Sequence, residues 1–205
     1  MSLIAGAAMG VLAGILSAVA LNAYLPLRRV SLLGRIALGG SLLGGIALGV
    51  SGALCGLSLP ALSAFLVVSA LLAALSLIDL ATRRLPNMLV LLLGLWGVLQ
   101  VPLGLNTWRS VWSGALFAAV MFGVLAVLGR GALGAGDVKL AIALGAVLGL
   151  QYAVRGLVLG VLAGGMGALL LLATRSATRK DSMAYGPYLA AGAWVTLLEM
   201  LGMLA

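Results

Sequence analysis

Long apolar runs, separated by short stretches with charges, prolines or small polar residues, constrain the fold of this chain more than any other feature. A transmembrane α-helix needs about 20 predominantly apolar residues, and several of the runs reach that length. The alternation of polar and apolar residues that is typical of membrane β-barrels does not occur. The sequence therefore predicts an all-α bundle of transmembrane helices.

The composition excludes several classes of function. Hydrophobic residues make up 64% of the chain and charged residues 8%, whereas a soluble domain carries about 25% charged residues. The net charge of +8 comes from basic residues at the ends of apolar runs, without the basic and aromatic surface of a nucleic-acid-binding protein. Histidine is absent and Cys55 is the single cysteine, which excludes His-dependent triads, intrachain disulfides and Cys/His metal sites. We expect no cofactor and no metal, and we expect Cys55 to be a small core residue.

We expect about eight spans (six to eight) in a single domain over residues 1–205. They are placed at 2–25, 33–56, 60–80, 87–104, 109–129, 138–151, 153–173 and 186–205. The sixth is short for a complete crossing. The first is expected to be a transmembrane helix and not a cleaved signal peptide, because its positive charges follow the apolar run.

The basic residues predict an orientation. The odd-numbered connections hold Arg28, Arg29, Arg35, Arg83, Arg84, Arg130, Lys139, Arg175, Arg179 and Lys180, and the even-numbered ones hold Arg109 and Arg155. Because basic residues concentrate in cytoplasmic loops, we expect both termini outside and the odd-numbered loops in the cytoplasm.

The chain has four acidic residues, Asp79, Asp137, Asp181 and Glu199, and two of them lie where apolar runs meet basic loops. A carboxylate in such a place is costly and marks a functional site by default. Asp79 lies close to the end of its helix because Pro86 prevents continuation, and Asp137 begins the sixth span. Both fall on the predicted cytoplasmic side, so two carboxylates on different helices can meet at one depth.

Such a pair has a well-defined chemistry. Two neighbouring carboxylates do not both ionise readily, so one keeps its proton while the other acts as a base. The base takes a proton from water and the acid hydrogen-bonds the scissile carbonyl, which hydrolyses a peptide bond without a covalent intermediate. Helix dipoles suggest Asp137, near a helix N-terminus, as the initial base and Asp79, near a C-terminus, as the acid.

Structural roles are alternatives to these catalytic roles. Asp137 could cap its own helix, and Asp79 could pair with Arg83 one turn further on. Lys139 comes two positions after Asp137, nearly on the opposite helix face, so it need not contact that carboxylate. Lys139, Arg83 and Arg84 could contact substrate or anchor the chain at the interface, and anchoring is favoured. Asp181 is expected in a solvated loop, and Glu199 at an interhelical hydrogen bond or at the interface.

Three motifs occur in order along the chain. Asp79 is followed by Leu85-Pro86-Asn87, a glycine-rich turn is formed by Gly134-Ala135-Gly136-Asp137-Val138-Lys139-Leu140, and the last apolar run is preceded by Met183-Ala184-Tyr185-Gly186-Pro187-Tyr188-Leu189. Together they resemble the motifs of the type IV prepilin peptidases, a family of membrane aspartic proteases. In that resemblance Asp79 and its loop look like the first catalytic aspartate and its proline-containing loop, the glycine-rich turn looks like the GxGD motif, and residues 183–189 look like the segment before the last helix. The resemblance covers about residues 60–205.

The resemblance implies a peptidase that removes the basic leader of prepilin-like or pseudopilin-like precursors, after a glycine, at the cytoplasmic face of the inner membrane. It implies that Asp79 and Asp137 are the catalytic pair. The supporting residues that it implies are Gly134, Gly136, Lys139, Pro86, Asn87, Gly186 and Pro187. The implied partners are the precursor protein and the lipid bilayer, with no nucleic acid. Many bacterial members also methylate the new N-terminus through a cytoplasmic insertion with paired cysteines. That insertion is missing here, so we expect no methyltransferase activity.

Other functions remain open at this point. A different GxGD protease would cut within substrate transmembrane helices, although the 85–87 loop and the 185–189 motif favour a prepilin peptidase. A transporter or assembly subunit could use its carboxylates to relay protons or bind cations. A Ser–Lys signal peptidase is disfavoured because such an enzyme acts outside the cytoplasm, whereas Lys139 and Lys180 fall on the predicted cytoplasmic side.

Overall fold

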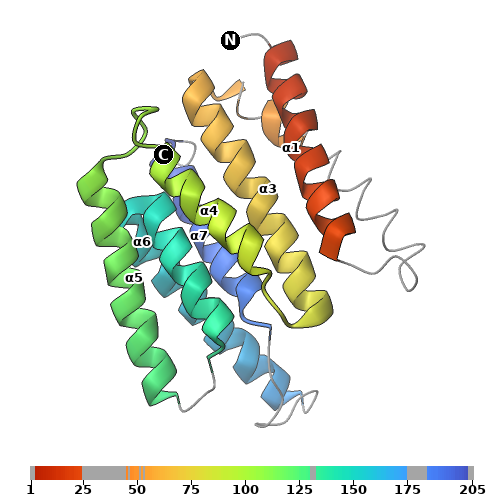
Figure 1. Ribbon diagram of the computed structural model, residues 1–205. Coiled ribbons are helices and arrows are strands. Elements are labelled where there is room, and N and C mark those ends of the chain that lie inside the picture. Colours follow the sequence, from red (N-terminus) through yellow and green to blue (C-terminus); the bar gives the residue numbers. More distant parts are fainter. Residues whose placement is uncertain are drawn as a thin grey trace.

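The computed structural model describes residues 3–24, 45, 47–50, 52, 54–129, 133–174 and 184–202, and its regular structure there is entirely helical (Figure 1). The helices are α1 (Leu3–Tyr24), α3 (Leu59–Thr82), α4 (Asn87–Leu99), α5 (Trp108–Leu128), α6 (Ala135–Ala173) and α7 (Gly186–Met200). The all-α prediction is therefore confirmed. Most of the predicted span 33–56 lies outside the described residues.

Three helical stretches are long and apolar enough to cross a membrane, namely α3, α5 and Ala135–Leu170 of α6. The stretch Gly6–Val19 of α1 and the whole of α4 are shorter apolar helices. These findings support a membrane protein, whereas the number of spans and the side on which the termini lie stay predictions.

Most predicted spans match helices to within a few residues, and two boundaries differ for identifiable reasons. The span predicted at 87–104 ends at Leu99, because a turn follows in which Gly104 has a φ of 72°. The spans predicted at 138–151 and 153–173 are the two segments of α6, which meet at Gly149 with φ 69° and ψ 169°. Glycine adopts this conformation without the steric cost that other residues incur. The first segment packs along α5 and the second along α7 (Figure 1).

Glycines at the helix contacts bring backbones together. A Cβ on Gly145 of α6 would lie 2.7 Å from the carbonyl carbon of Gly114 in α5, and one on Gly97 of α4 would lie 2.8 Å from the carbonyl carbon of Ala146. Small residues permit such close approach in membrane bundles, where van der Waals packing drives association. Large apolar side chains such as Phe65 and Phe122 fill the remaining interior, each at most 1% exposed.

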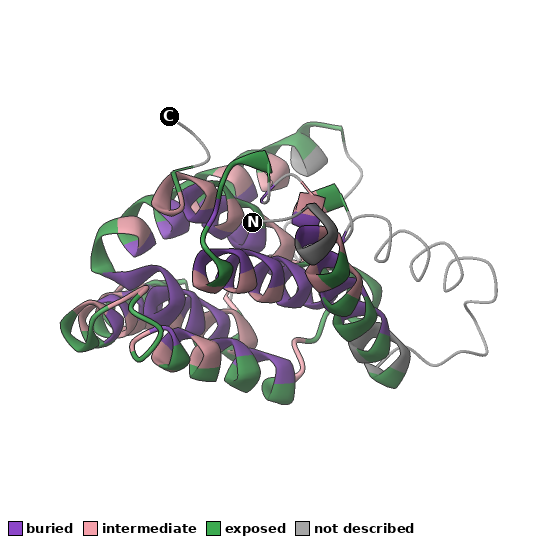
Figure 2. Ribbon diagram, turned by 90° about the horizontal axis from the view of Figure 1, so that it is seen from above, coloured by how far each residue is buried: buried purple, intermediate pink, exposed green. Residues whose placement is uncertain are grey.

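The outer helix faces are apolar as well. Figure 2 shows buried residues where helices face one another and exposed residues on their outer sides. Several of the exposed residues are large and apolar, including Leu116 at 65% and Val127 at 78% exposure. Contiguous apolar surface of this kind is rare on soluble monomers, and a lipid environment accounts for it.

Cys55 is exposed, so the expectation of a core position is wrong. The apolar run that contains it does not continue as helix, because the chain turns at Cys55 and Gly56, where Gly56 has a φ of 71°. The residue therefore lies in a connection ahead of α3 and not on a packed helix face.

Four helix ends meet at one end of the bundle, which is the lower end in Figure 1. They are the C-terminus of α3 and the N-termini of α4, α6 and α7. Side chains and backbone groups from these ends contact one another across the bundle, through pairs such as Asp79 with Gly186 and Asn87 with Lys139. This convergence of helix ends positions the candidate site.

The glycine contact between α5 and α6 leads to a stability prediction. Gly145→Ala should lower the free energy of unfolding by about 1–3 kcal/mol, since the new methyl group would overlap the Gly114 backbone. Thermal unfolding in detergent measures the change. The control is Gly123→Ala in α5, where a Cβ meets no atom within 4 Å. Equal melting temperatures for the two variants would show that the α5–α6 contact is looser than described.

Candidate active site

Asp79 lies near the C-terminus of α3 and is only 4% exposed. Its Oδ2 accepts a hydrogen bond from the backbone N–H of Gly186, at 3.0 Å, in a buried contact between α3 and α7. A buried carboxylate without a donor would be strongly disfavoured. The start of α7 therefore supplies the donor that lets Asp79 occupy this position.

The sequence of α7 suits this role. Gly186 is its first residue, and the first-turn N–H groups of a helix have no partner inside the helix. A Cβ on Gly186 would lie 2.8 Å from Asp79 Oδ2, so glycine lets the backbone come this close. Pro187 follows at a position where the missing N–H costs nothing. Gly186, predicted as a supporting residue, thus lies directly at Asp79, and Pro187, predicted with it, is the next residue of α7.

Asp137 is the third residue of α6 and is partly exposed. Its Oδ2 accepts a hydrogen bond from the Gly134 N–H at 3.2 Å. This is the reciprocal half of a capping box, so the capping role considered for Asp137 is present. A carboxylate has a second oxygen and further lone pairs, and the cap therefore leaves acceptor capacity for another partner.

Both glycines of the GxGD stretch make close contacts. A Cβ on Gly134 would lie 3.2 Å from Asp137 Oδ2, and one on Gly136 would lie 3.4 Å from Cβ of Leu85. Leu85, in the connection between α3 and α4, therefore lies against the start of α6, at an ordinary van der Waals distance from a Cβ at position 136. In this way the Leu85-Pro86-Asn87 loop and the GxGD turn form one unit.

The two aspartates line the same pocket, whose volume is about 330 Å³. The other lining residues are Arg83, Arg84, Leu85, Asn87, Gly134 and Gly136. The carboxylates are near enough for their charges to interact. The structure thus places Asp79 and Asp137 at one pocket, whereas the sequence predicted only a shared depth at which they could meet.

The connection between α3 and α4 turns sharply at this pocket. Arg83 adopts a left-handed conformation with φ 52° and ends α3, while its N–H donates to the Asp79 carbonyl at 2.7 Å. Pro86 precedes α4, and Asn87 is the first residue of that helix. The turn directs Arg83 and Arg84 to the pocket, although sequence reasoning favoured them as membrane anchors.

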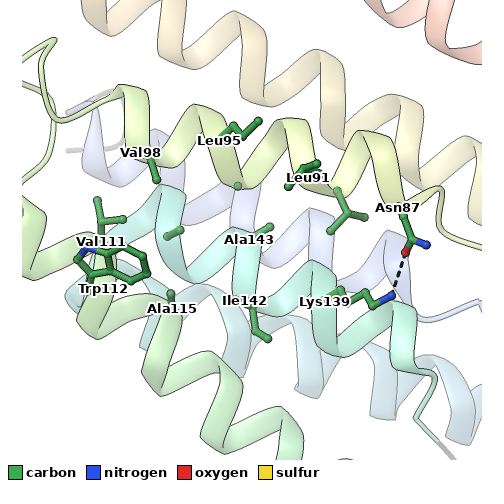
Figure 3. A pocket seen from close by; sticks show the side chains of 13 residues that line it. Asn87, Leu91, Leu95, Val98, Val111, Trp112, Ala115, Lys139, Ile142 and Ala143 are labelled. Carbon is green, nitrogen blue, oxygen red and sulfur yellow. Dashed lines mark hydrogen bonds between the residues drawn. The ribbon is translucent and has the colours of Figure 1, made fainter.

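Lys139 lies outside this pocket. Its Nζ donates to Oδ1 of Asn87 at 3.1 Å, and the side chain is exposed (Figure 3). The expectation that Lys139 need not contact Asp137 agrees with this position. The bond to Asn87 was not foreseen, because it joins two helix starts that are far apart in the sequence.

Tyr185, directly before α7, completes the surroundings of the site. Its hydroxyl donates to the Val161 carbonyl at 3.3 Å, and its ring packs where a Cβ on Gly164 would lie. Burial raises the pKa of Tyr185 above its ordinary value, and the negative charge of Asp137 raises it further. The phenol therefore lies within electrostatic reach of Asp137.

Glu199 lies away from the two catalytic candidates. Glu199 pairs with Arg155 across α6 and α7, with Oε2 and Nη1 3.4 Å apart, which confirms the expected interhelical contact. Asp181 lies outside the described residues. Among the residues that are described, no cluster of three or more His, Cys, Asp or Glu side chains could hold a metal ion.

Comparison with known proteins places these residues in context. The sequence profile of the type IV leader peptidase family matches residues 66–172. A prepilin leader peptidase/N-methyltransferase of Aeromonas salmonicida is 36% identical over 143 residues, which are 66% of this chain and 48% of the relative. The protein of the same name from Pseudomonas aeruginosa is 36% identical over 137 residues, 62% of this chain and 46% of the relative. The chain thus spans about half the length of the curated relatives that it matches. No solved structure shows a significant match.

The proximity of Tyr185 and Asp137 can be measured by titration. Asp137→Asn should lower the pKa of Tyr185 towards its ordinary value, because it removes a negative charge that opposes formation of the phenolate. Ultraviolet pH titrations, each taken as the difference from the matching Tyr185→Phe protein, isolate this phenol. Glu199→Gln is the control and should leave the titration unchanged. A Tyr185 titration that does not respond to Asp137→Asn would mean that the two groups are further apart.

Proposed function

The chain belongs to the type IV leader peptidase family, and on that basis we propose that it is a membrane aspartic endopeptidase. It cleaves the basic leader from prepilin-like precursors at the cytoplasmic face of the inner membrane. One observation carries the proposal, namely that Asp79 and Asp137, from two different helices, line a single pocket. Each is also held by a backbone N–H at a helix start.

The proposed reaction uses one proton shared between the two carboxylates. The ionised carboxylate takes a proton from a water molecule, whose oxygen forms a bond to the scissile carbonyl carbon. The protonated carboxyl gives its proton to the carbonyl oxygen, so a neutral tetrahedral intermediate forms. Its C–N bond then breaks as the carboxyl that is now protonated gives its proton to the nitrogen, while a hydroxyl of the intermediate gives its proton to the other carboxylate. The leader leaves with a new carboxyl group and the mature chain with a new amine, and the carboxylate pair again holds one proton.

Helix dipoles do not distinguish Asp137 as the base from Asp79 as the acid. Asp79 lies at the C-terminal end of α3, but it also faces the N-terminus of α7 through Gly186. A helix N-terminus stabilises negative charge, and Asp137 has the same kind of environment at the start of α6. We therefore assign the proton to the pair and not to one residue.

The charge at the pocket suggests how a precursor lies. Arg83 and Arg84 are positively charged lining residues, and they disfavour binding of a basic leader inside the pocket. We propose that the leader extends away from these arginines, towards the aqueous side, while the apolar region after the cleavage site stays in the membrane. An acidic group early in the mature region would be attracted to Arg83 and Arg84.

We propose peptidase activity without methyl transfer. The curated relatives carry both activities in their names. Cys55 is the single cysteine and cannot form a paired-cysteine zinc site.

The catalytic pair is tested by cleavage of a prepilin in membranes. Asp79→Asn and Asp137→Asn should each lower the cleavage rate at least about 100-fold, because each removes a group that transfers a proton. Glu199→Gln makes the same chemical change at the other end of the bundle and should retain activity.

Folding of each variant is checked by its thermal unfolding. A folded Asp79→Asn or Asp137→Asn protein with normal cleavage would falsify the paired mechanism. A wild-type protein that cuts no precursor but carries protons or cations across vesicles would instead favour the transporter function.

The role of the α7 start has its own test. Gly186→Ala should slow cleavage about 100-fold, since a Cβ there would displace the Asp79 carboxylate by a large fraction of an ångström. Gly165→Ala, where a Cβ meets no atom within 4 Å, is the matched control. Cleavage at the wild-type rate by Gly186→Ala would show that the bond to Asp79 is not needed for catalysis.

A further inference from the structure

A second pocket of about 490 Å³ lies between α4, α5 and α6, outside the catalytic pocket. Figure 3 shows it as a groove between the three helices, with Asn87 and Lys139 at one end and Trp112 at the other. Its walls are almost wholly apolar and include Leu95 and Ala115. The groove is thus apolar along its length, with one polar, cationic end.

The charge at that end is not neutralised by its hydrogen bond. Lys139 is exposed, and its Nζ donates to the neutral amide oxygen of Asn87 at 3.1 Å. An ammonium group can make three hydrogen bonds, so it can also hold an anionic oxygen. An occupant that matches this groove has an anionic group at one end and a long apolar chain.

We propose that the groove binds one acyl chain of an anionic phospholipid, with the phosphate on Lys139. Basic residues at the membrane surface attract anionic lipid headgroups. The groove runs along α4 from Asn87 to Val98, which is about 16 Å at 1.5 Å per residue. An extended acyl chain can lie along this length while its headgroup stays near the helix starts.

The size of the groove favours an acyl chain over a protein helix. A helix with its side chains is about 10–12 Å wide, so a piece about 16 Å long fills more than about 1,200 Å³. The groove offers about 490 Å³, less than half of that volume, so a helix could seat only one face in it. A single acyl chain is much narrower than a helix. The exposed side chains of α4 and α5 border the groove in which it would lie.

The lipid site adjoins the catalytic pocket but does not depend on it. Asn87 lines both pockets, so a headgroup on Lys139 would lie beside the opening between α3, α4 and α6. The inference goes beyond the proposed function, because lipid binding is measured without any cleavage.

Native mass spectrometry of the full chain in detergent tests the proposal. Phosphatidylglycerol and phosphatidylcholine with identical acyl chains are titrated separately onto the protein. Lys139→Gln should weaken phosphatidylglycerol binding about fivefold, and Lys139→Arg should restore it. Arg109→Gln removes an exposed positive charge at the start of α5, away from Lys139. This variant should bind phosphatidylglycerol as the wild type does.

The apolar part of the site is tested with a filled groove. Ala115→Phe should reduce the phosphatidylglycerol adduct, whereas Leu116→Phe, on the neighbouring exposed position of α5, should not. Thermal unfolding confirms that both variants fold. Equal binding of the two lipids, or equal effects of the two phenylalanine variants, would overturn the proposal. A protein helix can be detected by cross-linking from position 115. If such a helix is captured and added phosphatidylglycerol does not reduce its capture, the groove holds a protein and the proposal is overturned.

Discussion

The bundle depends on the satisfaction of one buried carboxylate. Asp79 lies among apolar helices, and its hydrogen bond from Gly186 offsets the cost of removing it from water. The bond fixes the start of α7 against the end of α3, while Gly186 itself has no side chain that would hold the helices apart. The same bond that stabilises the packing therefore also orients a reactive group, so structure and chemistry share one contact.

The rest of the site follows from the convergence of helix ends. α6 begins beside the end of α3 because Leu85 packs on Gly136, and α4 begins beside α6 because Asn87 accepts from Lys139. Helix starts carry N–H groups that favour anions, which explains why two carboxylates can be placed together in an apolar protein. Their shared pocket also holds two arginines that reduce the net negative charge.

The sequence predicted the helical class and the pairing of Asp79 with Asp137, because apolar length and the scarcity of acids are properties of the chain itself. It did not predict the Asp79–Gly186 bond, which joins residues separated by 107 positions. It also placed the break within α6 a few residues too late. Among 30 glycines, nothing local distinguishes Gly149 as the one with a positive φ in that helix. Arg83 and Arg84 were favoured as membrane anchors. Nothing in the sequence indicated the left-handed conformation of Arg83 that ends α3, so the position of the two residues at the pocket was not predicted.

The position of Gly149 also bears on the surrounding bilayer. From Ala135 to Gly149 the first segment of α6 rises only about 21 Å, and α4 is a helix of 13 residues, whereas a hydrocarbon core is about 30 Å thick. Two short helices side by side create a hydrophobic mismatch, to which lipids respond by thinning. The bilayer is therefore expected to be thinner beside α4 and the first segment of α6. Such thinning shortens the distance between bulk water and the carboxylates at the helix starts.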